Sequence, residues 1–521
     1  MPEYKAPGVY VEEVERGPKA IEGVSTSVAG FVGVTERGPL DPTLVTSFAD
    51  FRRTFGGYAT DEGWSNLSYE TSLPYAVEGY FANGGSRAYV ARVVPKAWVD
   101  NTFVASATLA DGSGNNATDA VTVTAVGPGF WGDSVVVEVG PASSGDGDRF
   151  KLRIGYWRNG GTFSTGSGYD GIVDSKGRPT HEEVYDELSA EKTDSNYYET
   201  MVSGVSSLVT LEPANDGVQP QEATTVLSIS GSHNSNTSAN DYTGQTYSDR
   251  AGLATFETVD EITMVSVPDE SQHDVSGDVV THCADRKDRI ALLSVRSEPS
   301  TSSGLDSGVV SEYAALYYPW VRIRDPLTGL QRAIPPTGHV AGIYARSDAE
   351  HGVHKAPANE QVRGIDGLDR TVTKGEQESL NPMGVNCIRS FRGRGIRVWG
   401  ARTTSSNPSW KYVNVRRLFM YIEESIDEGT QWVVFEPNDE ELWARVRQTI
   451  SDFLTGLWEA GALMGSTPEE AFFVTCDRTT MTQNDIDNGR LICEIGIAPV
   501  KPAEFVVFRI AQWTGGAEGG G

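Results

Sequence analysis

The feature that most constrains the fold is an order of strand, helix and strand that stops and later resumes. Residues 28–34 (VAGFVGV) form an apolar run typical of a buried strand, and a helical stretch and a second strand follow, up to residue 95. The same order resumes at residues 262–267, with a helix near 275–286 and a strand at 290–295. This alternation predicts an α/β core with a parallel sheet.

Between these halves lies a segment of different composition, residues 96–254, which is rich in Gly, Ser, Thr, Asn and Asp. Short β-type runs occur in it at 120–126, 134–139 and 225–229. A core interrupted in this way predicts an inserted, mainly β module exposed at the surface.

The last third predicts a second α/β region. A helix ends at Gly429, and residues 431–435 form a β-prone run. Asn438 is expected to cap the next helix, with Glu441 completing a capping box. That helix carries an apolar stripe at helical spacing, made of Leu442, Val446, Ile450, Phe453, Leu454 and Leu457. Further strands are expected at 472–476, 491–497 and 504–510.

A β-prone segment lies outside this body at each end of the chain. Val9, Tyr10 and Val11 stand between Pro7-Gly8 and Gly17-Pro18, in a stretch too short to form a core. At the other end the apolar residues Phe505, Val506, Val507 and Phe508 precede a glycine-rich tail. The fold class is therefore mixed α/β, in several domains with extended arms.

The expected segments follow from these boundaries. They are an N-terminal arm (1–25), the first part of the core (26–95), the insertion (96–254), the second part of the core (255–400), a C-terminal α/β domain (401–499), and a C-terminal arm with tail (500–521).

Charge restricts the possible partners. The formal net charge is -28, and the 43 basic residues comprise 11 Lys and 32 Arg. Such a surface repels polyanions, so nucleic-acid binding is not expected. A low Lys content with many Asp and Glu residues fits adaptation to concentrated salt, although an ordinary acidic protein has a similar composition.

No apolar run approaches the roughly 18 residues of a membrane span, and Met1–Lys5 does not resemble a signal peptide, so we expect synthesis in the cytoplasm.

No motif carries catalytic chemistry. Gly127–Gly132 matches GxGxxG, but a strand follows where a nucleotide site needs a helix N-terminus, so we interpret it as a turn. No GK[ST] occurs, and His351 and His354, expected in a loop, lack a third ligand. The four cysteines show no CxxC spacing and are expected to be free thiols. We therefore predict no catalytic residues, no cofactor and no metal.

Several segments, in their order along the chain, resemble the tail sheath proteins of contractile phage tails and related injection machines. They are 6–14 (APGVYVEEV), 23–33 (GVSTSVAGFVG), 317–320 (YYPW), 334–338 (IPPTG), 341–346 (AGIYAR), 355–359 (KAPAN), 380–382 (LNP), 398–403 (VWGART), 414–417 (NVRR), 435–438 (FEPN) and 502–505 (PAEF). The resemblance covers 6–34 and about 255–512, and it is weak across 96–254.

The resemblance implies a structural protein that polymerises as stacked hexameric rings around an inner tail tube. Terminal arms would complete sheet edges of neighbouring subunits, and a metastable extended sheath would contract after a baseplate trigger, without ATP. Implied partners are other sheath subunits, the tube protein, and baseplate and tail terminator proteins, with no membrane insertion. The C-terminal domain would face the tube, with Arg445 and Arg447 as candidate contacts, and the insertion would face outward.

Alternatives remain open at this point. The sheath could belong to a virus tail, which would place it in a virion assembled in the host cytoplasm, or to a cell-encoded injection system. From other classes, a surface adhesin with β modules and an α/β enzyme are the competing interpretations.

Overall fold

The structure, a computed structural model, describes residues 20–58, 71–100, 103–111, 118–158, 163–164, 166, 168–229, 237–244, 251–269, 274–295 and 308–509. The chain divides into two compact units. The larger comprises Gly23–Val353 and Pro357–Glu424, and the smaller comprises Met1–Glu22, His354–Ala356 and Ser425–Gly521. The predicted N-terminal strand at Val9–Val11 lies outside the described residues.

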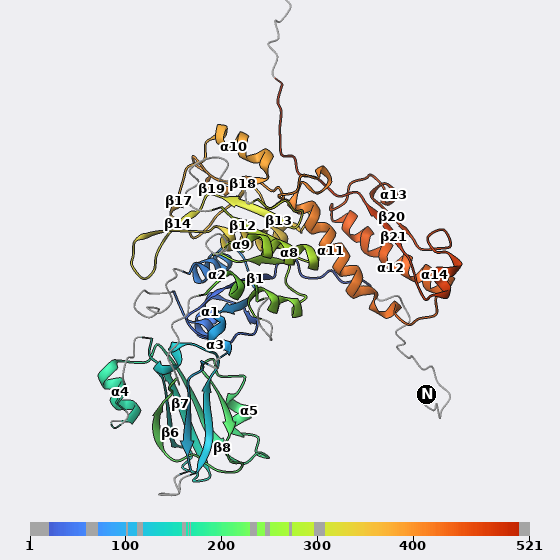
Figure 1. Cartoon of the computed structure of the whole chain (residues 1–521). Coiled ribbons are helices and arrows are strands. Elements are labelled where there is room, and N and C mark those ends of the chain that lie inside the picture. Colours follow the sequence, from blue (N-terminus) through green and yellow to red (C-terminus); the bar gives the residue numbers. More distant parts are fainter. Residues whose placement is uncertain are drawn as a thin grey trace, which may run out of the picture. The chain divides into compact units, whose positions relative to one another are not determined.

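A nine-stranded sheet forms the centre of the larger unit (Figure 1), in the order β16-β19-β18-β13-β12-β11-β1-β3-β2. The strands from β18 to β3 run parallel, and β2, β19 and β16 pair antiparallel at the two ends. The predicted parallel sheet is therefore confirmed. Its strands are β1 (Ala29–Val34), β2 (Thr43–Val45), β3 (Ala88–Val93), β11 (Met264–Ser266), β12 (Ile290–Ser294), β13 (Ala314–Tyr318), β16 (Glu360–Gln361), β18 (Val385–Phe391) and β19 (Gly395–Val398).

Apolar cores cover both faces of this sheet, which explains why its strands are continuous apolar runs. On one face Phe31 packs with Tyr80 of α2 (Leu73–Ala82) and Tyr344 of α9 (Thr337–His351). On the other face the next residue of β1, Val32, packs with side chains of α8 (Ser276–Arg286) and the 3₁₀ segment η4 (Gly252–Thr258). Because side chains alternate along β1, this strand contributes residues to two separate cores.

The larger unit also contains α1 (Phe48–Phe55), α10 (Lys374–Leu380) and a small sheet of β14 (Val321–Arg324), β15 (Gln331–Ile334) and β17 (Gly367–Leu368).

Helices α2 and α9 pack backbone against backbone through glycines. A Cβ added to Gly338 would lie 2.1 Å from the carbonyl oxygen of Ala76, and one added to Gly342 would lie 2.3 Å from that of Tyr80. Neither backbone atom can rotate away. Glycine at both positions is therefore required by the close approach of the helices.

A buried ion pair joins α9 to α11 (Val413–Thr430). Arg417 donates to both carboxylate oxygens of Asp348, at 2.9 and 2.6 Å, and to the carbonyl oxygen of Thr26. Both charged side chains are 3% exposed. Because the pair is mutually satisfied, loss of either partner would leave a buried charge alone.

Residues of the insertion form two antiparallel sheets, ordered β10-β6-β7-β8 and β4-β5-β9. Their inner faces share one apolar core. The predicted mainly β character is confirmed, and the boundaries at 96 and 254 stay a prediction. The elements are α3 (Lys96–Asp100), β4 (Ser106–Ala110), β5 (Asp119–Ala125), β6 (Val135–Pro141), β7 (Arg149–Tyr156), α4 (Gly168–Lys176), β8 (His181–Ser189), α5 (Tyr198–Val202), β9 (Val209–Pro213), β10 (Ala223–Val226) and α6 (Ala239–Thr243).

Buried polar contacts tie the insertion to the sheet. Glu36, just after β1, accepts hydrogen bonds from the Tyr156 hydroxyl at 2.6 Å and from Nε of Arg158 at 2.9 Å. Arg92 of β3 donates to the carbonyl oxygens of Gly38 and Pro128, both at 2.9 Å. The insertion is thereby held at Pro128, Tyr156 and Arg158 against the residues that follow β1 and against β3.

The smaller unit is built around α12 (Glu440–Glu459), which packs on the hairpin of β20 (Phe472–Thr475) and β21 (Glu494–Ile497). Leu442, Val446, Ile450 and Leu454 of the predicted stripe are buried, and Phe453 and Leu457 are half-buried. Two short helices, α13 (Pro468–Ala471) and α14 (Gln483–Asp487), complete it.

Two local predictions in this region are wrong. Residues 431–435 do not form a strand: Gln431–Val433 is a 3₁₀ turn, and Phe435 has φ 69° with a fully exposed side chain. The residue that caps α12 is Asp439, whose carboxylate accepts from the Leu442 N–H at 2.9 Å, and the predicted capping box is not formed. Asn438 accepts from the Trp443 indole instead. A carboxylate is favoured here because it also interacts with the helix dipole.

We expect Gly342→Ala to lower the free energy of unfolding by about 1–3 kcal/mol, because the methyl group would force α2 and α9 apart. Gly375→Ala is the matched control, since it lies in helix α10 with open space around it and should be neutral or slightly stabilising. Urea unfolding of the two variants measures the difference. Equal stability of both would contradict the close-packing argument.

We expect stability to depend on Asp269, a fully buried carboxyl that accepts from the Ser72 N–H at the start of α2. Burial raises its pKa from 3.8 to about 6. The folded state therefore holds the proton more tightly, so this contribution is full below about pH 4 and is lost as pH rises through about 6, by up to about 3 kcal/mol. Asp269→Asn should remove that pH dependence, as measured by urea unfolding across the window.

Asp278→Asn is the charge-matched control, because Asp278 lies half-buried in the first turn of α8. It should retain the wild-type slope of stability against pH. A wild-type slope in Asp269→Asn as well would contradict the role of Asp269.

Candidate assembly interface

The C-terminal segment leaves the smaller unit as an extended chain. The Val500 N–H donates to the carbonyl oxygen of Ala462, and Pro499 bridges to Leu463. Beyond this anchor Phe505, Val506, Val507 and Phe508 are 73%, 68%, 77% and 84% exposed. The strand predicted for 504–510 is not formed within the chain as far as residue 509, the last that the structure describes here. Four consecutive exposed apolar side chains form a surface that normally requires a partner.

The hairpin of β20 and β21 is a sheet of two strands, with Phe472 opposite Ile497 and Thr475 opposite Glu494. Among the residues described, no third strand joins it. Helix α12 packs against it, while Phe473 remains 58% exposed. A two-stranded sheet of this kind can accept further strands along its outer edges.

The structure separates the two arginines predicted to face a tube. Arg445 is 44% exposed, with its guanidinium 3.6 Å from Glu436 and 5.3 Å from the ring centre of Trp432. Arg447 is half-buried and donates to the carbonyl oxygen of Cys476 at 2.9 Å. Arg445 is therefore presented to solvent, whereas Arg447 ties α12 to the end of β20.

Sequence reasoning missed a group of exposed apolar side chains on the smaller unit. They are Val434, Phe435, Met464, Phe473 and Ile492. For Phe473 a signal existed: side chains alternate along a strand, so Phe473 lies on the opposite face from Phe472 and Val474, which are half-buried. For Phe435 no signal existed, because its exposure follows from a left-handed backbone conformation.

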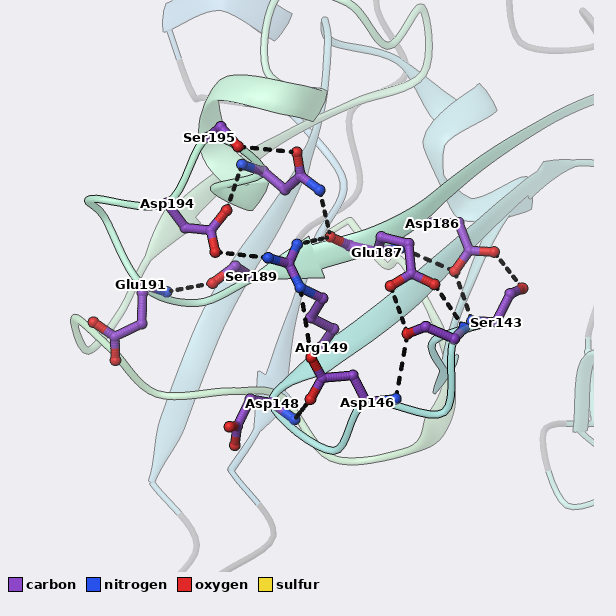
Figure 2. Close-up of polar contacts among 12 residues, drawn as sticks. Ser143, Asp146, Asp148, Arg149, Asp186, Glu187, Ser189, Glu191, Asp194 and Ser195 are labelled. Carbon is purple, nitrogen blue, oxygen red and sulfur yellow. Dashed lines mark hydrogen bonds and ion pairs between the residues drawn. The ribbon is translucent and has the colours of Figure 1, made fainter.

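A dense polar network lies in the insertion, around the turn between β6 and β7 (Figure 2). Ser143 donates to Asp186 through its N–H and hydroxyl, and Ser144 donates likewise to Glu187. Arg149 donates to the backbone carbonyl oxygen of Glu187 and to the carboxylate of Asp194, both at 2.9 Å. The Ser143 hydroxyl foremost, with the N–H groups of Ser143 and Glu187 and the Lys151 ammonium, holds the pKa of Asp186 below its usual value. The carboxylates of Asp186 and Glu187 on β8 thus hold the neighbouring turn in place by accepting from its serines.

The residues considered for chemistry take structural positions. The glycines at 127–132 lead into a short 3₁₀ turn (Phe130–Ser134) and then β6. His351, expected in a loop, is instead the last residue of α9. Cys283, Cys387 and Cys476 are buried free thiols, and Cys493 is half-buried and free. Within the described ranges, no group of three or more His, Cys, Asp or Glu side chains could hold a metal ion, and no helix is long and apolar enough to cross a membrane.

Two family models match the chain consecutively. The model for the phage tail sheath protein central domain matches residues 238–404, and that for the phage tail sheath C-terminal domain matches 405–512. Together they span more than half of the 521 residues. The chain belongs to the phage tail sheath protein family.

Two curated tail sheath proteins are similar to this chain in sequence over part of their length. The putative prophage major tail sheath protein of Pseudomonas aeruginosa (strain UCBPP-PA14) is 28% identical over 202 residues, 37% of this chain and 51% of that protein. The tail sheath protein of Enterobacteria phage T4 is 23% identical over 263 residues, 50% of this chain and 38% of that protein. The chain thus matches about half or less of the length of these relatives.

Solved structures show the same fold over nearly the whole chain. The sheath of an extracellular contractile injection system in its contracted state has a TM-score of 0.57 at 23% identity, covering 98% of this chain and 99% of that one. A sheath tail protein from Listeria innocua has a TM-score of 0.56 at 14% identity, covering 92% and 96%. The mixed α/β, multi-domain architecture is therefore that of contractile sheath proteins.

Proposed function

We propose that this chain is a non-enzymatic sheath subunit that polymerises as stacked hexameric rings around an inner tube and contracts to drive the tube through a target envelope. The observation that carries the proposal is the exposed run Phe505–Phe508, in the same unit as a two-stranded sheet open to further strands. In a sheath subunit, the exposed run of one copy would pair with the two-stranded sheet of a neighbouring copy.

Strand donation supplies the connection between subunits. The C-terminal arm (500–521), and by the same reasoning the N-terminal arm with Val9, Tyr10 and Val11, adds a strand beside β20 or β21 of a neighbouring subunit. Main-chain hydrogen bonds set the register, and each buried apolar side chain contributes about 1.5–3 kcal/mol. Four such side chains are enough to keep copies linked while the subunits move.

Contraction draws its free energy from new interfaces between subunits. The extended sheath is metastable, and a baseplate trigger releases rotation and outward movement of rigid subunits. Support comes from the fold shared with sheaths solved in the contracted state. Tail terminator and tube proteins complete the set of partners, and none of these steps requires a nucleotide.

The proposed orientation places the smaller unit toward the tube and the insertion outward. Arg445 is the favoured tube contact, because its guanidinium is exposed on α12. Arg447 contributes to this surface mainly by fixing α12 on β20. The acidic surface of the whole chain, with net charge -28, suits a protein that works in concentrated salt.

Two machines can use such a subunit. We favour a virus tail, assembled in host cytoplasm and used for genome ejection, because the curated relatives include tail sheath proteins of phages. The alternative, a cell-encoded injection system, is supported by the structural likeness to sheaths of that class. Neighbouring genes separate them: a capsid and terminase indicate a virus, and an ATPase with toxins indicates an injection device.

We expect the purified chain to form hollow, striated tubes in negative-stain electron microscopy, in molar salt more readily than in dilute salt.

Deletion of residues 1–20 should leave a folded monomer that no longer polymerises, because the strand-donating arm is gone. Tubes of normal length from the deletion variant would contradict strand exchange. If the full chain gives only monomers, a cognate tube protein is added as a template, and monomers in its presence would contradict the sheath function.

A point variant tests the C-terminal arm. Val507→Glu should abolish tubes, since a charge cannot be buried against a neighbouring sheet without large cost. Val205→Glu is the matched control, because Val205 is 66% exposed in the insertion and should leave assembly intact. Equal assembly of both variants would show that the arm stays in solvent.

Arg445→Glu should weaken co-sedimentation with the tube protein while leaving the unfolding midpoint unchanged, because the side chain is exposed. Arg53→Glu, at a 63% exposed position of the larger unit, is the control and should sediment like the wild type. Unaltered tube binding by Arg445→Glu would remove this residue from the proposed interface.

A further inference from the structure

Two thiols lie opposite each other at the end of the hairpin in the smaller unit. The ladder of β20 and β21 ends with Thr475 opposite Glu494. The next pair of residues is Cys476 and Cys493, one step beyond the ladder. Their thiol groups are in hydrogen-bonding contact, and both are free.

The register gives this pair the spacing that a disulfide needs. At the other end of the hairpin, the Ala498 N–H donates to the carbonyl oxygen of Ala471, which makes that opposed pair a hydrogen-bonded one. Hydrogen-bonded and non-hydrogen-bonded pairs alternate along an antiparallel ladder, so the register, continued one step past Thr475 and Glu494, would make Cys476 and Cys493 a non-hydrogen-bonded pair. The Cα atoms of such pairs are about 4.5 Å apart, within the range of roughly 4.4–6.8 Å found in disulfides.

Accessibility differs between the two sulfurs. Cys476 is fully buried, whereas Cys493 is half-buried. An external reagent therefore reaches the pair through Cys493. The other two cysteines, Cys283 and Cys387, are buried in the larger unit, on α8 and β18.

The surroundings favour the thiolate of Cys476. The guanidinium of Arg447 donates to the carbonyl oxygen of this residue at 2.9 Å, so a fixed positive charge lies beside the pair. The hydrogen bond from the Cys493 thiol lowers the pKa of Cys476, burial opposes this effect, and Arg447 adds to it. A neighbouring arginine and a partly open site are typical of reactive cysteines.

We propose that Cys476 and Cys493 form a redox-active dithiol, which closes to a cross-strand disulfide on exposure to a low-molecular-weight disulfide. The inference goes beyond the proposed sheath function and does not depend on it. Its consequence is a covalent link between β20 and β21 in oxidising surroundings.

The exchange balances in two steps. The Cys493 thiol passes its proton to the Cys476 thiolate, and the Cys493 sulfur attacks one sulfur of oxidised glutathione, forming a mixed disulfide and releasing one glutathione thiolate. Cys476 passes this proton on to the released glutathione, and its thiolate then attacks the Cys493 sulfur, forming the Cys476–Cys493 bond and releasing the second glutathione. The protons lost by the two cysteines are taken up by the two glutathione molecules, which are the reduced products.

The full-length protein is incubated with oxidised glutathione, remaining thiols are alkylated, and peptides are mapped by mass spectrometry without reduction. We expect two of the four thiols to be lost together, a peptide pair joined through Cys476 and Cys493, and no lasting glutathione adduct. Cys283 and Cys387 should stay reduced in the same sample as internal controls.

Serine variants resolve the order of the steps. Cys476→Ser should accumulate a stable glutathione adduct at Cys493, because the second thiolate is missing. Cys493→Ser should leave Cys476 unreacted in the folded protein, because that sulfur is buried. Cys387→Ala should behave like the wild type.

Two results with the wild-type protein would overturn the proposal, whatever the variants do. One is a glutathione adduct at Cys493 that persists as the end product, which would show that the sulfurs cannot reach bonding geometry. The other is no reaction at either residue after prolonged incubation, which would show that the pair is closed to the reagent.

Discussion

Pairing of β1 along both of its edges is the constraint on which the larger unit depends. β1 pairs with β3 on one side, from Ala29–Ala88 to Val34–Val93, and with β11 on the other. Those two neighbours come from opposite sides of the insertion in sequence, so main-chain hydrogen bonds reunite a core that the chain divides. Because both faces of β1 are buried, its residues must be apolar, and small where neighbours approach: Gly30 lies under Phe256, and Gly33 lies against Leu73.

Much of this architecture could be predicted from the sequence, because burial on two faces leaves continuous apolar runs and burial on one face leaves a helical stripe. The predictions failed where structure depends on a partner that local sequence does not specify. Residues 431–435 are β-prone, but a strand needs a neighbour, and the chain turns there instead. Asn438 and Asp439 are both good caps, so only packing could decide between them. Arg445 and Arg447 look alike in sequence, yet one side chain is exposed and the other is held by a carbonyl oxygen.

The candidate interface was harder to predict than the core, for a physical reason. Apolar periodicity reports what is buried within one chain, and the arm residues Phe505–Phe508 are exposed in this one. A two-stranded hairpin is also close to the smallest sheet that is stable, and here it relies on α12 for support. Under the proposed function, the exposed arm and the outer edges of the hairpin are covered by another copy of the chain. The apolar periodicity of a single sequence does not mark surfaces that are covered in this way.

The insertion occupies a crossover connection between parallel strands. The chain leaves the carboxyl end of β3, builds two sheets, and returns through η4, which packs on β1 and β3, before entering β11. On the return path Tyr242 of α6 and the segment η4 pack on the sheet face, so the connection between β3 and α6 can change in length wherever the contacts of Glu36 and Arg92 are kept. A lineage could therefore lengthen, shorten or exchange this module while the strands of the nine-stranded sheet keep their register.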